Sequence, residues 1–219
     1  WGIYNIRDKI SAAYIANLHH VNPDNIDLLE YENDSIPTIM EGSLDNYTAF
    51  YNFIDFNDLS GENNYRFIET WMDIDEFINY YICKIYCDNF LWPYRDVRMW
   101  RERKEGARWR WILFDTDLSF GIIRRGMTDG YTNNTFKRLI PNDSKGSRIE
   151  RVTRIFVQLL QNEEFKTKFV QRFAGYLNTV FHPDTVVALI DRISGTIGPE
   201  MPRHIDRWKD EYYEPFDSD

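Results

Sequence analysis

Two aspartates separated by one residue, Asp115 and Asp117, are the side chains in this sequence best suited to chemistry. In an extended backbone, side chains two residues apart project to the same side, so the two carboxylates lie close enough to share a divalent cation. Ligands that offer only oxygen suit Mg²⁺, Mn²⁺ or Ca²⁺. Alternatively, one carboxylate caps the turn that leads through Phe120 and Gly121, and the spacing alone leaves both interpretations open.

A second polar group comes earlier in the chain, in a loop that contains Asp88, Asn89 and Asp96. An Asp at the end of a strand, followed closely by Phe-Gly, is the arrangement by which protein kinases hold Mg²⁺ on nucleotide phosphates. Kinases place a catalytic-loop Asp and Asn before that metal-binding Asp. This order indicates phosphoryl transfer, with Asp88 and Asp96 as candidate catalytic groups and Asn89 as a candidate cofactor contact.

Basic side chains that could bind phosphates gather in a short stretch, of which Arg98 is the candidate cofactor contact. Because arginines here alternate with Trp100, Trp109 and Trp111, stacking on the aromatic rings as structural support is favoured for most of them. Lys9 is a further candidate phosphate contact, and a solvent-facing lysine is the alternative.

The elements that must position these groups follow from the hydrophobic pattern. Asp73 and Glu76 form a capping-box-like start for a long amphipathic helix that ends near Asp88, and the alternation from Trp109 to Phe114 predicts a strand leading into the acidic pair. Strands are also predicted at residues 1–7, 28–31 and 97–100, a helix over 44–58 that stops at Gly61, a loop over 126–147, and helices over 152–160, 165–181, 186–193 and 201–208.

Composition excludes several classes of protein. The 219 residues are 43% hydrophobic, which is enough for one globular domain, and the net charge of −9 argues against a nucleic-acid binder. We expect the only cysteines, Cys83 and Cys87, to be free structural thiols, because two cysteines without a nearby His pair do not suit zinc. No apolar run is long enough to span a membrane.

Successive motifs of this chain resemble those of the CotH family of atypical, secretory-type kinases. The resemblance covers nearly the whole sequence and rests on residues 1–10, Asp88-Asn89, Trp92-Pro93, 98–101, 109–111, Asp115-Thr116-Asp117 through Phe120-Gly121, 165–173 and 200–208.

The resemblance implies an α+β, kinase-like fold forming one domain over 1–219, with a β-rich part at 1–40 and a mainly helical C-lobe at 41–219. It also implies that the most N-terminal strands, with the nucleotide lysine, precede Trp1. The implied activity is transfer of phosphate from ATP, with Mg²⁺ or Mn²⁺, to Ser or Thr of a protein substrate. Asp115 and Asp117 match the family's metal-binding motif, and an exported or cell-surface location is implied.

The sequence departs from the family pattern beside the Trp-Pro pair. Leu91 stands where members commonly have Asp, and Arg95 and Asp96 stand where they have two Asn. If the missing carboxylate is the catalytic base, Asp88 or Asp96 must replace it. The alternatives are therefore an active kinase and an inactive relative that serves as a surface binding module. A third hypothesis is a glycan-binding aromatic groove at Trp92, Tyr94 and Trp100, which requires exposed rings.

Overall fold

The computed structural model describes residues 3–4, 6–32, 36–122, 132–140 and 148–212. The chain forms two compact units: Lys9–Phe169 is one, and Trp1–Asp8 together with Val170–Asp219 is the other. Helices outnumber strands, and a small antiparallel sheet lies in the larger unit, so the expected α+β class is confirmed.

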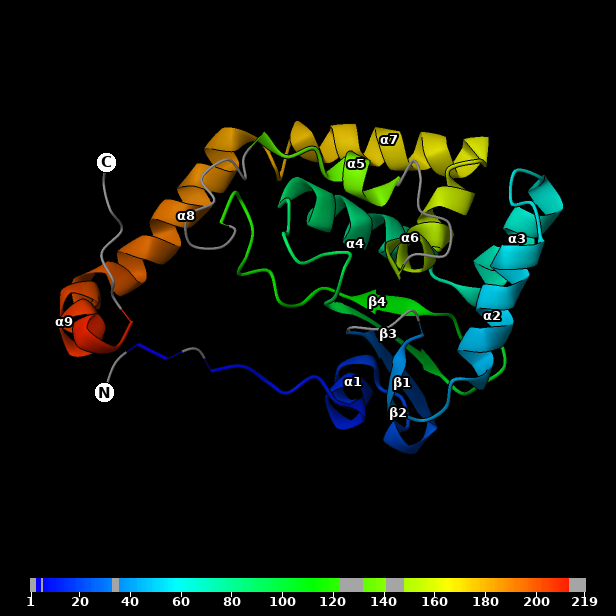
Figure 1. The fold of residues 1–219 in the computed structure, drawn as a ribbon, viewed down its shortest axis with the longest axis horizontal. Helices are drawn as coiled ribbons and strands as arrows, with labels where there is room; N and C mark the ends of the chain where they lie inside the picture. Colours follow the sequence, from blue (N-terminus) through cyan, green and yellow to red (C-terminus); the bar gives the residue numbers. More distant parts are fainter. Residues whose placement is uncertain (1–2, 5, 33–35, 123–131, 141–147, 213–219) are drawn as a thin grey trace. The chain divides into compact units, whose positions relative to one another are not determined.

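The sheet of the larger unit joins strands that are far apart in the sequence. Its order is β2 (Thr38–Glu41), β1 (Ile26–Tyr31), β3 (Val97–Glu102) and β4 (Arg110–Ile112), and all neighbouring strands are antiparallel (Figure 1). In this register Leu28 lies opposite Trp100, and Met99 lies opposite both Leu29 and Trp111. Strand β3, which begins directly after Asp96, therefore pairs with the N-terminal strand β1, and β4, which leads to Asp115 and Asp117, pairs with β3.

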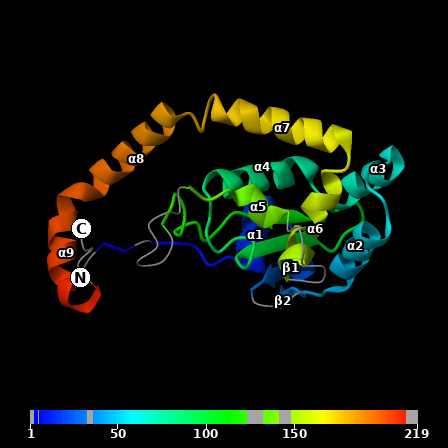
Figure 2. The ribbon, with the colours of Figure 1, turned by 45° about the horizontal axis from the view of Figure 1, so that its top comes forward.

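Each face of the sheet is covered by a different helix. Helix α1 (Ala12–His19) packs against Leu28 and Trp100 on one face. Since side chains alternate along a strand, Met99 and Trp111 point to the other face, where the Trp111 ring centroid lies 4.5 Å from that of Phe77 in helix α4 (Ile74–Tyr86). Figure 2 shows α4 running beside the sheet.

Helix α4 is fixed to the sheet at its first turn. The carboxylate of Asp73 caps the helix by accepting from the backbone N–H of Glu76, and the Asp73 N–H donates to the carbonyl of Trp109 at 2.9 Å. One turn later, Glu76 Oε2 accepts from the backbone N–H of Trp111 at 2.9 Å. These bonds set the height of α4 along β4, and so the place where its last turn meets the acidic segment.

Aromatic rings form the core between α4, α6 (Arg148–Leu159) and the first half of α7 (Glu163–Leu177). The ring of Tyr81 stacks on Phe156 with centroids 4.3 Å apart, and Phe156 in turn meets Phe169 at 5.3 Å. Helices α2 (Asp45–Phe56), α3 (Glu62–Trp71) and the short α5 (Thr135–Leu139) complete this unit. Seven buried aromatic side chains contribute to this core: Phe77, Tyr80, Tyr81, Trp92, Phe156, Phe165 and Phe169.

The smaller unit consists of the second half of α7, α8 (Pro183–Ile197), the 3₁₀ turn Gly198–Glu200, α9 (Met201–Tyr212) and the described residues of the N-terminal segment. The backbone N–H of Ile3 donates to His204 Nδ1 of α9 at 3.0 Å, which gives that histidine a structural role. Several apolar side chains of α8 are exposed, including Ile190 and Ile193. A membrane-spanning helix is absent from the described part of the chain.

Most elements expected from the sequence are present, with ends displaced by a few residues. The helix expected at 44–58 is α2, the capped helix that begins after Asp73 is α4, and the four C-terminal helices are α6, α7, α8 and α9. The strands expected at 28–31, 97–100 and 109–114 are β1, β3 and β4. Cys83 and Cys87 are free thiols, as expected.

Three local expectations were wrong. The described residues of 1–7 form no strand, because their backbone lies beside α9 without a ladder partner, and Ile6 is 99% exposed. Gly61 does not end a helix; it is the N-cap of α3. The segment 126–147, expected to be loop, contains α5, and its residues 126–131 and 141–147 lie outside the described ranges.

The stacked core leads to a stability prediction. We expect Phe156→Ala to lower the free energy of unfolding by about 3–5 kcal/mol, because the ring is fully buried and its loss leaves a cavity between α4 and α7. Urea unfolding of the whole chain measures it. The matched control is Phe56→Ala on α2, whose side chain is 80% exposed and whose loss should cost less than about 0.5 kcal/mol. Equal costs for the two variants would contradict the described core.

The link between α4 and β4 predicts a pH dependence. Burial, with a smaller contribution from the neighbouring Asp73 carboxylate, raises the pKa of Glu76 to about 8 against the lowering effects of the Trp111 N–H and of Arg110. A raised pKa contributes stability that is complete below the unfolded value and is lost as the pH rises through the folded one. We expect Glu76→Gln to remove a loss of stability of about 3–4 kcal/mol between pH 5 and pH 8, measured by urea unfolding at both values. Parallel pH profiles for wild type and variant would refute this assignment.

Candidate functional site

The acidic segment after β4 is held by one buried amide side chain. Asn89 directly follows the last turn of α4 and is 1% exposed. Its Nδ2 donates to the carbonyl of Asp115 at 3.1 Å, to Ser119 Oγ at 3.3 Å and to the carbonyl of Leu118 at 3.4 Å. Three acceptors spread over the segment 115–119 thus converge on this residue, which positions the segment rather than facing a ligand.

Two backbone bonds close the same junction. The N–H of Phe90 donates to the carbonyl of Leu118, and the N–H of Phe120 donates to the carbonyl of Cys87, both at 2.7 Å. The turn after α4 and the acidic segment therefore run against each other and form one rigid structure. This arrangement brings the two polar groups of the sequence, around residues 88–96 and 115–117, to the same place.

A lysine that the sequence analysis overlooked lies under this junction. Lys84, on the last turn of α4, is fully buried, and its Nζ donates to the carbonyl of Phe114 at 2.9 Å and to Asn89 Oδ1 at 3.4 Å. Burial lowers the pKa of Lys84 to about 8, while the carboxylates of Asp96 and Asp115 act in the opposite direction. A buried cation is thus placed in the field of the candidate site.

Asp96 is the buried carboxylate of the site. Its side chain is 8% exposed, and its Oδ2 is buried without a hydrogen-bond partner. Burial raises the pKa of Asp96, the negative charge of Asp115 raises it further, and the Lys84 ammonium lowers it. Asp96, Asp115 and Lys84 therefore share one electrostatic environment. Asp117 is exposed and acts on the same lysine more weakly.

The backbone at this site is unusual. Asp88, Asp96 and Asp115 have φ angles of +45°, +63° and +49°, and Phe120 has +55°. Positive φ is uncommon for residues other than glycine, although Asp tolerates it better than most, and such conformations concentrate at functional sites. Both polar loops turn sharply here, and the aspartates predicted from the sequence lie at these turns.

Asp88 is engaged elsewhere. Its Oδ1 accepts a hydrogen bond from Thr135 Oγ1 at 2.7 Å and forms an ion pair with Arg138, both on α5. Arg138 also donates to the carbonyls of Asn89 and Phe90. Asp88 therefore connects α5 to the turn after α4, and Asp96 is the carboxylate that the structure brings near Asp115.

The two basic candidates lie differently. Arg98 is on β3, where its Nε pairs with Glu30 at 2.9 Å and its guanidinium lies 4.2 Å from the ring centroid of Phe114. This is the supporting role that the alternation with aromatic residues favoured. Lys9 is exposed in the segment before α1.

The aromatic-groove hypothesis is wrong at the positions proposed for it. Trp92 is fully buried against Tyr80 and Tyr81 of α4, and Trp100 is 6% exposed and packs beside His19. Only Tyr94, at 38%, is exposed among the three rings. Because Trp92 and Trp100 are buried in the core, their rings are not accessible for stacking on a sugar.

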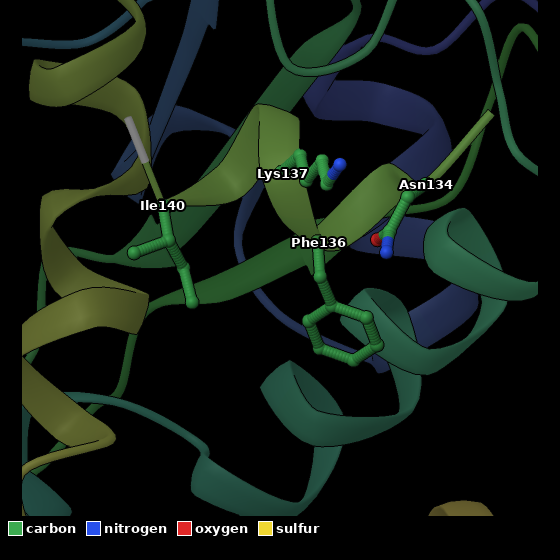
Figure 3. A pocket seen from close by; sticks show the side chains of 4 residues that line it. All are labelled: Asn134, Phe136, Lys137 and Ile140. Atoms are coloured by element: carbon green, nitrogen blue, oxygen red, sulfur yellow. The ribbon is translucent and has the colours of Figure 1, made fainter. Parts of the chain in front are cut away.

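A shallow pocket of about 430 Å³ lies beside α5 and is lined by Asn134, Phe136, Lys137 and Ile140 (Figure 3). These side chains are on the part of α5 that does not contact Asp88. The lining includes none of the carboxylates discussed above, so this pocket is separate from the candidate site.

The donor set can be compared with the needs of a metal. Within the described ranges, no group of three His, Cys, Asp or Glu side chains is arranged to hold a metal ion. A Mg²⁺ ion carried by a nucleotide uses only one or two carboxylates, because phosphate oxygens and water complete its shell. Asp115 and Asp117 supply that number of carboxylates, and the Oδ2 of Asp96, which is buried without a hydrogen-bond partner, is left to accept a proton.

The fold and the carboxylates at the end of a strand define an α+β domain with an acidic site beside its small antiparallel sheet. The chain matches the model of the family described as CotH kinase protein over residues 1–217, and it belongs to this family. No curated protein and no solved structure matched the chain.

One functional residue could have been found in the sequence. Lys84 lies three residues after Tyr81 and seven after Phe77, on the stripe of α4 that otherwise enters the core. A cation on an apolar stripe is unusual enough to indicate a buried role. Arg138 had no such signal, because it lies in a segment whose composition predicts loop.

The bonds of Asn89 give a third prediction. We expect Asn89→Ala to destabilise the chain by about 2–3 kcal/mol, because three acceptors lose their donor, and to speed hydrogen exchange of the Phe90 and Phe120 amides. Urea unfolding and amide exchange measure the two effects. Asn52→Ala on the exposed side of α2 is the control and should change neither. Unchanged exchange at both amides in Asn89→Ala would contradict the positioning role.

Proposed function

We propose that this chain is a protein kinase domain that transfers the γ-phosphoryl group of ATP to a Ser or Thr hydroxyl of a protein substrate, with Mg²⁺ or Mn²⁺. The observation that carries the proposal is the convergence of Asp115 and Asp96 at the junction after β4 in a chain of the CotH kinase family. We further propose that this protein is itself secreted or located at the cell surface, as its family resemblance implies.

Each residue has a defined task in this proposal. Asp115, supported by Asp117, which is exposed as Asp115 is, would hold the divalent cation, which when bound neutralises charge on the phosphates. Asn89 keeps the Asp115 backbone in place, and α4 carries Asn89 to it. Because phosphoryl transfer depends mainly on positioning and charge neutralisation, a rigid junction is the contribution that matters most.

The proposed reaction is a displacement at the γ-phosphorus of ATP by the substrate hydroxyl. The substrate hydroxyl oxygen forms a bond to the γ-phosphorus while the bond from that phosphorus to the bridging oxygen breaks, and ADP leaves with the bonding electron pair. The hydroxyl proton passes to the Asp96 carboxylate. Asp96 is preferred to Asp88 as the acceptor because Asp88 already accepts from Thr135 and pairs with Arg138.

A second candidate function is a non-catalytic relative that binds a surface partner. It is favoured by Leu91, which stands where the family commonly has Asp, and by the engagement of Asp88 with α5. Such a protein could keep the nucleotide site while lacking turnover. The two candidates therefore differ in phosphoryl transfer and not necessarily in binding.

The fourth prediction tests the site directly. We expect Mn²⁺ together with ATP to raise the melting temperature of the wild-type chain, because a ligand that binds only the native state stabilises it. Asp115→Asn should lose most of this shift, since the amide carries no charge to hold the cation. Glu105→Gln, an exposed carboxylate between β3 and β4, is the matched control and should keep the shift. Production of ADP and labelled protein from γ-labelled ATP measures turnover in the same samples.

The outcomes separate the hypotheses. A shift that depends on Asp115, accompanied by labelled protein that is lost in Asp96→Asn, supports the kinase. The same shift without ADP or label favours the non-catalytic relative. An identical shift in Asp115→Asn and wild type, or no shift in either, rejects the proposed nucleotide site.

A further inference from the structure

We propose that Lys84 sets the charge preference of the candidate site: its ammonium disfavours a free divalent cation at Asp115 and Asp96 and favours the anionic complex of that cation with a nucleotide. This inference rests on the proposed function but concerns a residue that the proposed function does not use. It makes Lys84 a residue that determines binding specificity without being catalytic.

The position of Lys84 carries the argument. A lysine is almost never fully buried unless its charge is compensated, because removing an ammonium from water is costly. The two hydrogen-bond acceptors of Lys84 Nζ, the carbonyl of Phe114 and Asn89 Oδ1, are neutral oxygens. The compensating negative charges are those of Asp96 and Asp115, which favour the charged form of this lysine.

The same contacts fix the ammonium in place. The Phe114 carbonyl directly precedes Asp115 in the chain, and Asn89 is the residue that holds the Asp115 carbonyl. The positive charge is therefore held by the backbone carbonyl before Asp115 and by the side chain that holds the Asp115 carbonyl. It cannot swing away into solvent as a surface lysine does, since Lys84 is fully buried on α4.

A fixed positive charge acts with opposite sign on the two forms of the ligand. A free Mn²⁺ ion carries two positive charges and is repelled, whereas the complex of Mn²⁺ with ATP carries a net negative charge and is attracted. In a partly dry site such an interaction is weakened by solvent much less than at a surface. Two carboxylates without the lysine would attract the free ion instead.

The test compares two ligands on the whole chain. We expect Lys84→Met to bind free Mn²⁺ about tenfold more tightly than wild type and to bind the Mn–ATP complex about tenfold more weakly, as measured by titration calorimetry or by thermal shift against concentration. Lys104→Met, an exposed lysine between β3 and β4, is the control and should change neither affinity by more than about twofold. A merely structural lysine would weaken both ligands together when it is replaced.

Two more variants protect the test from a failure to fold. Lys84→Gln removes the charge but keeps an N–H donor for the Phe114 carbonyl, and it should show the same opposed changes as Lys84→Met. Asp96→Asn removes a negative charge from the same field, and should weaken free Mn²⁺ and strengthen Mn–ATP. If the affinities for the two ligands move in the same direction, or do not move, in the folded variants, the role of Lys84 is overturned.

Failure of the proposed function would look different. Absence of both Mn–ATP binding and phosphoryl transfer in the wild type overturns the nucleotide site itself, whatever the Lys84 variants do. Intact Mn–ATP binding with unchanged affinities in the Lys84 variants overturns only the charge preference. The comparison of free-Mn²⁺ affinities between wild type and the Lys84 variants needs neither ATP nor turnover, so it measures the electrostatic effect of the lysine independently of the proposed function.

Discussion

Burial of the Lys84 ammonium is the constraint on which the rest of the site depends. A cation can remain in the core only if oxygens and negative charges are delivered to it, and here these come from three separate segments. The end of β4 supplies the Phe114 carbonyl, the turn after α4 supplies Asn89, and the loop before β3 contributes the charge of Asp96. The lysine therefore specifies how these segments meet, as well as the charge at their meeting point.

The bonds at the start of α4 make this meeting possible. Asp73 and Glu76 fix the first turn of the helix to Trp109 and Trp111, so the position of its last turn follows from the rigid rise of a helix. The aromatic core on the far side of α4, with Tyr81 stacked on Phe156, prevents the helix from tilting away. Capping thus fixes the first turn of the helix, packing fixes its middle, and the candidate site lies at its other end.

Local patterns in the sequence were sufficient for most elements and for the acidic pair. The capping residues of α4 and the alternation through Trp111 are signals that depend only on near neighbours, and both elements formed as the patterns indicate. The contacts between distant segments could not be predicted: the ion pair of Asp88 with Arg138, the charge of Asp96 close to Lys84, and the contact of Ile3 with α9. The apolar stripe of α4 indicates that Lys84 is buried, but nothing in the sequence indicates which carboxylate lies near it.

Of the departures from the family pattern described in the sequence analysis, the charge introduced by Asp96 is compensated in the structure, and the carboxylate lost at Leu91 is not. Asp96 puts a negative charge where the family commonly has a neutral Asn, close to Asp115, and the Lys84 ammonium offsets the repulsion between the two carboxylates. This change is compensated within the site, so the capacity to hold a nucleotide-borne cation can survive it. Leu91 removes a carboxylate and brings no new group that accepts a proton. If the chain transfers phosphate as proposed, Asp96 must serve as that acceptor, whereas nucleotide binding does not require it.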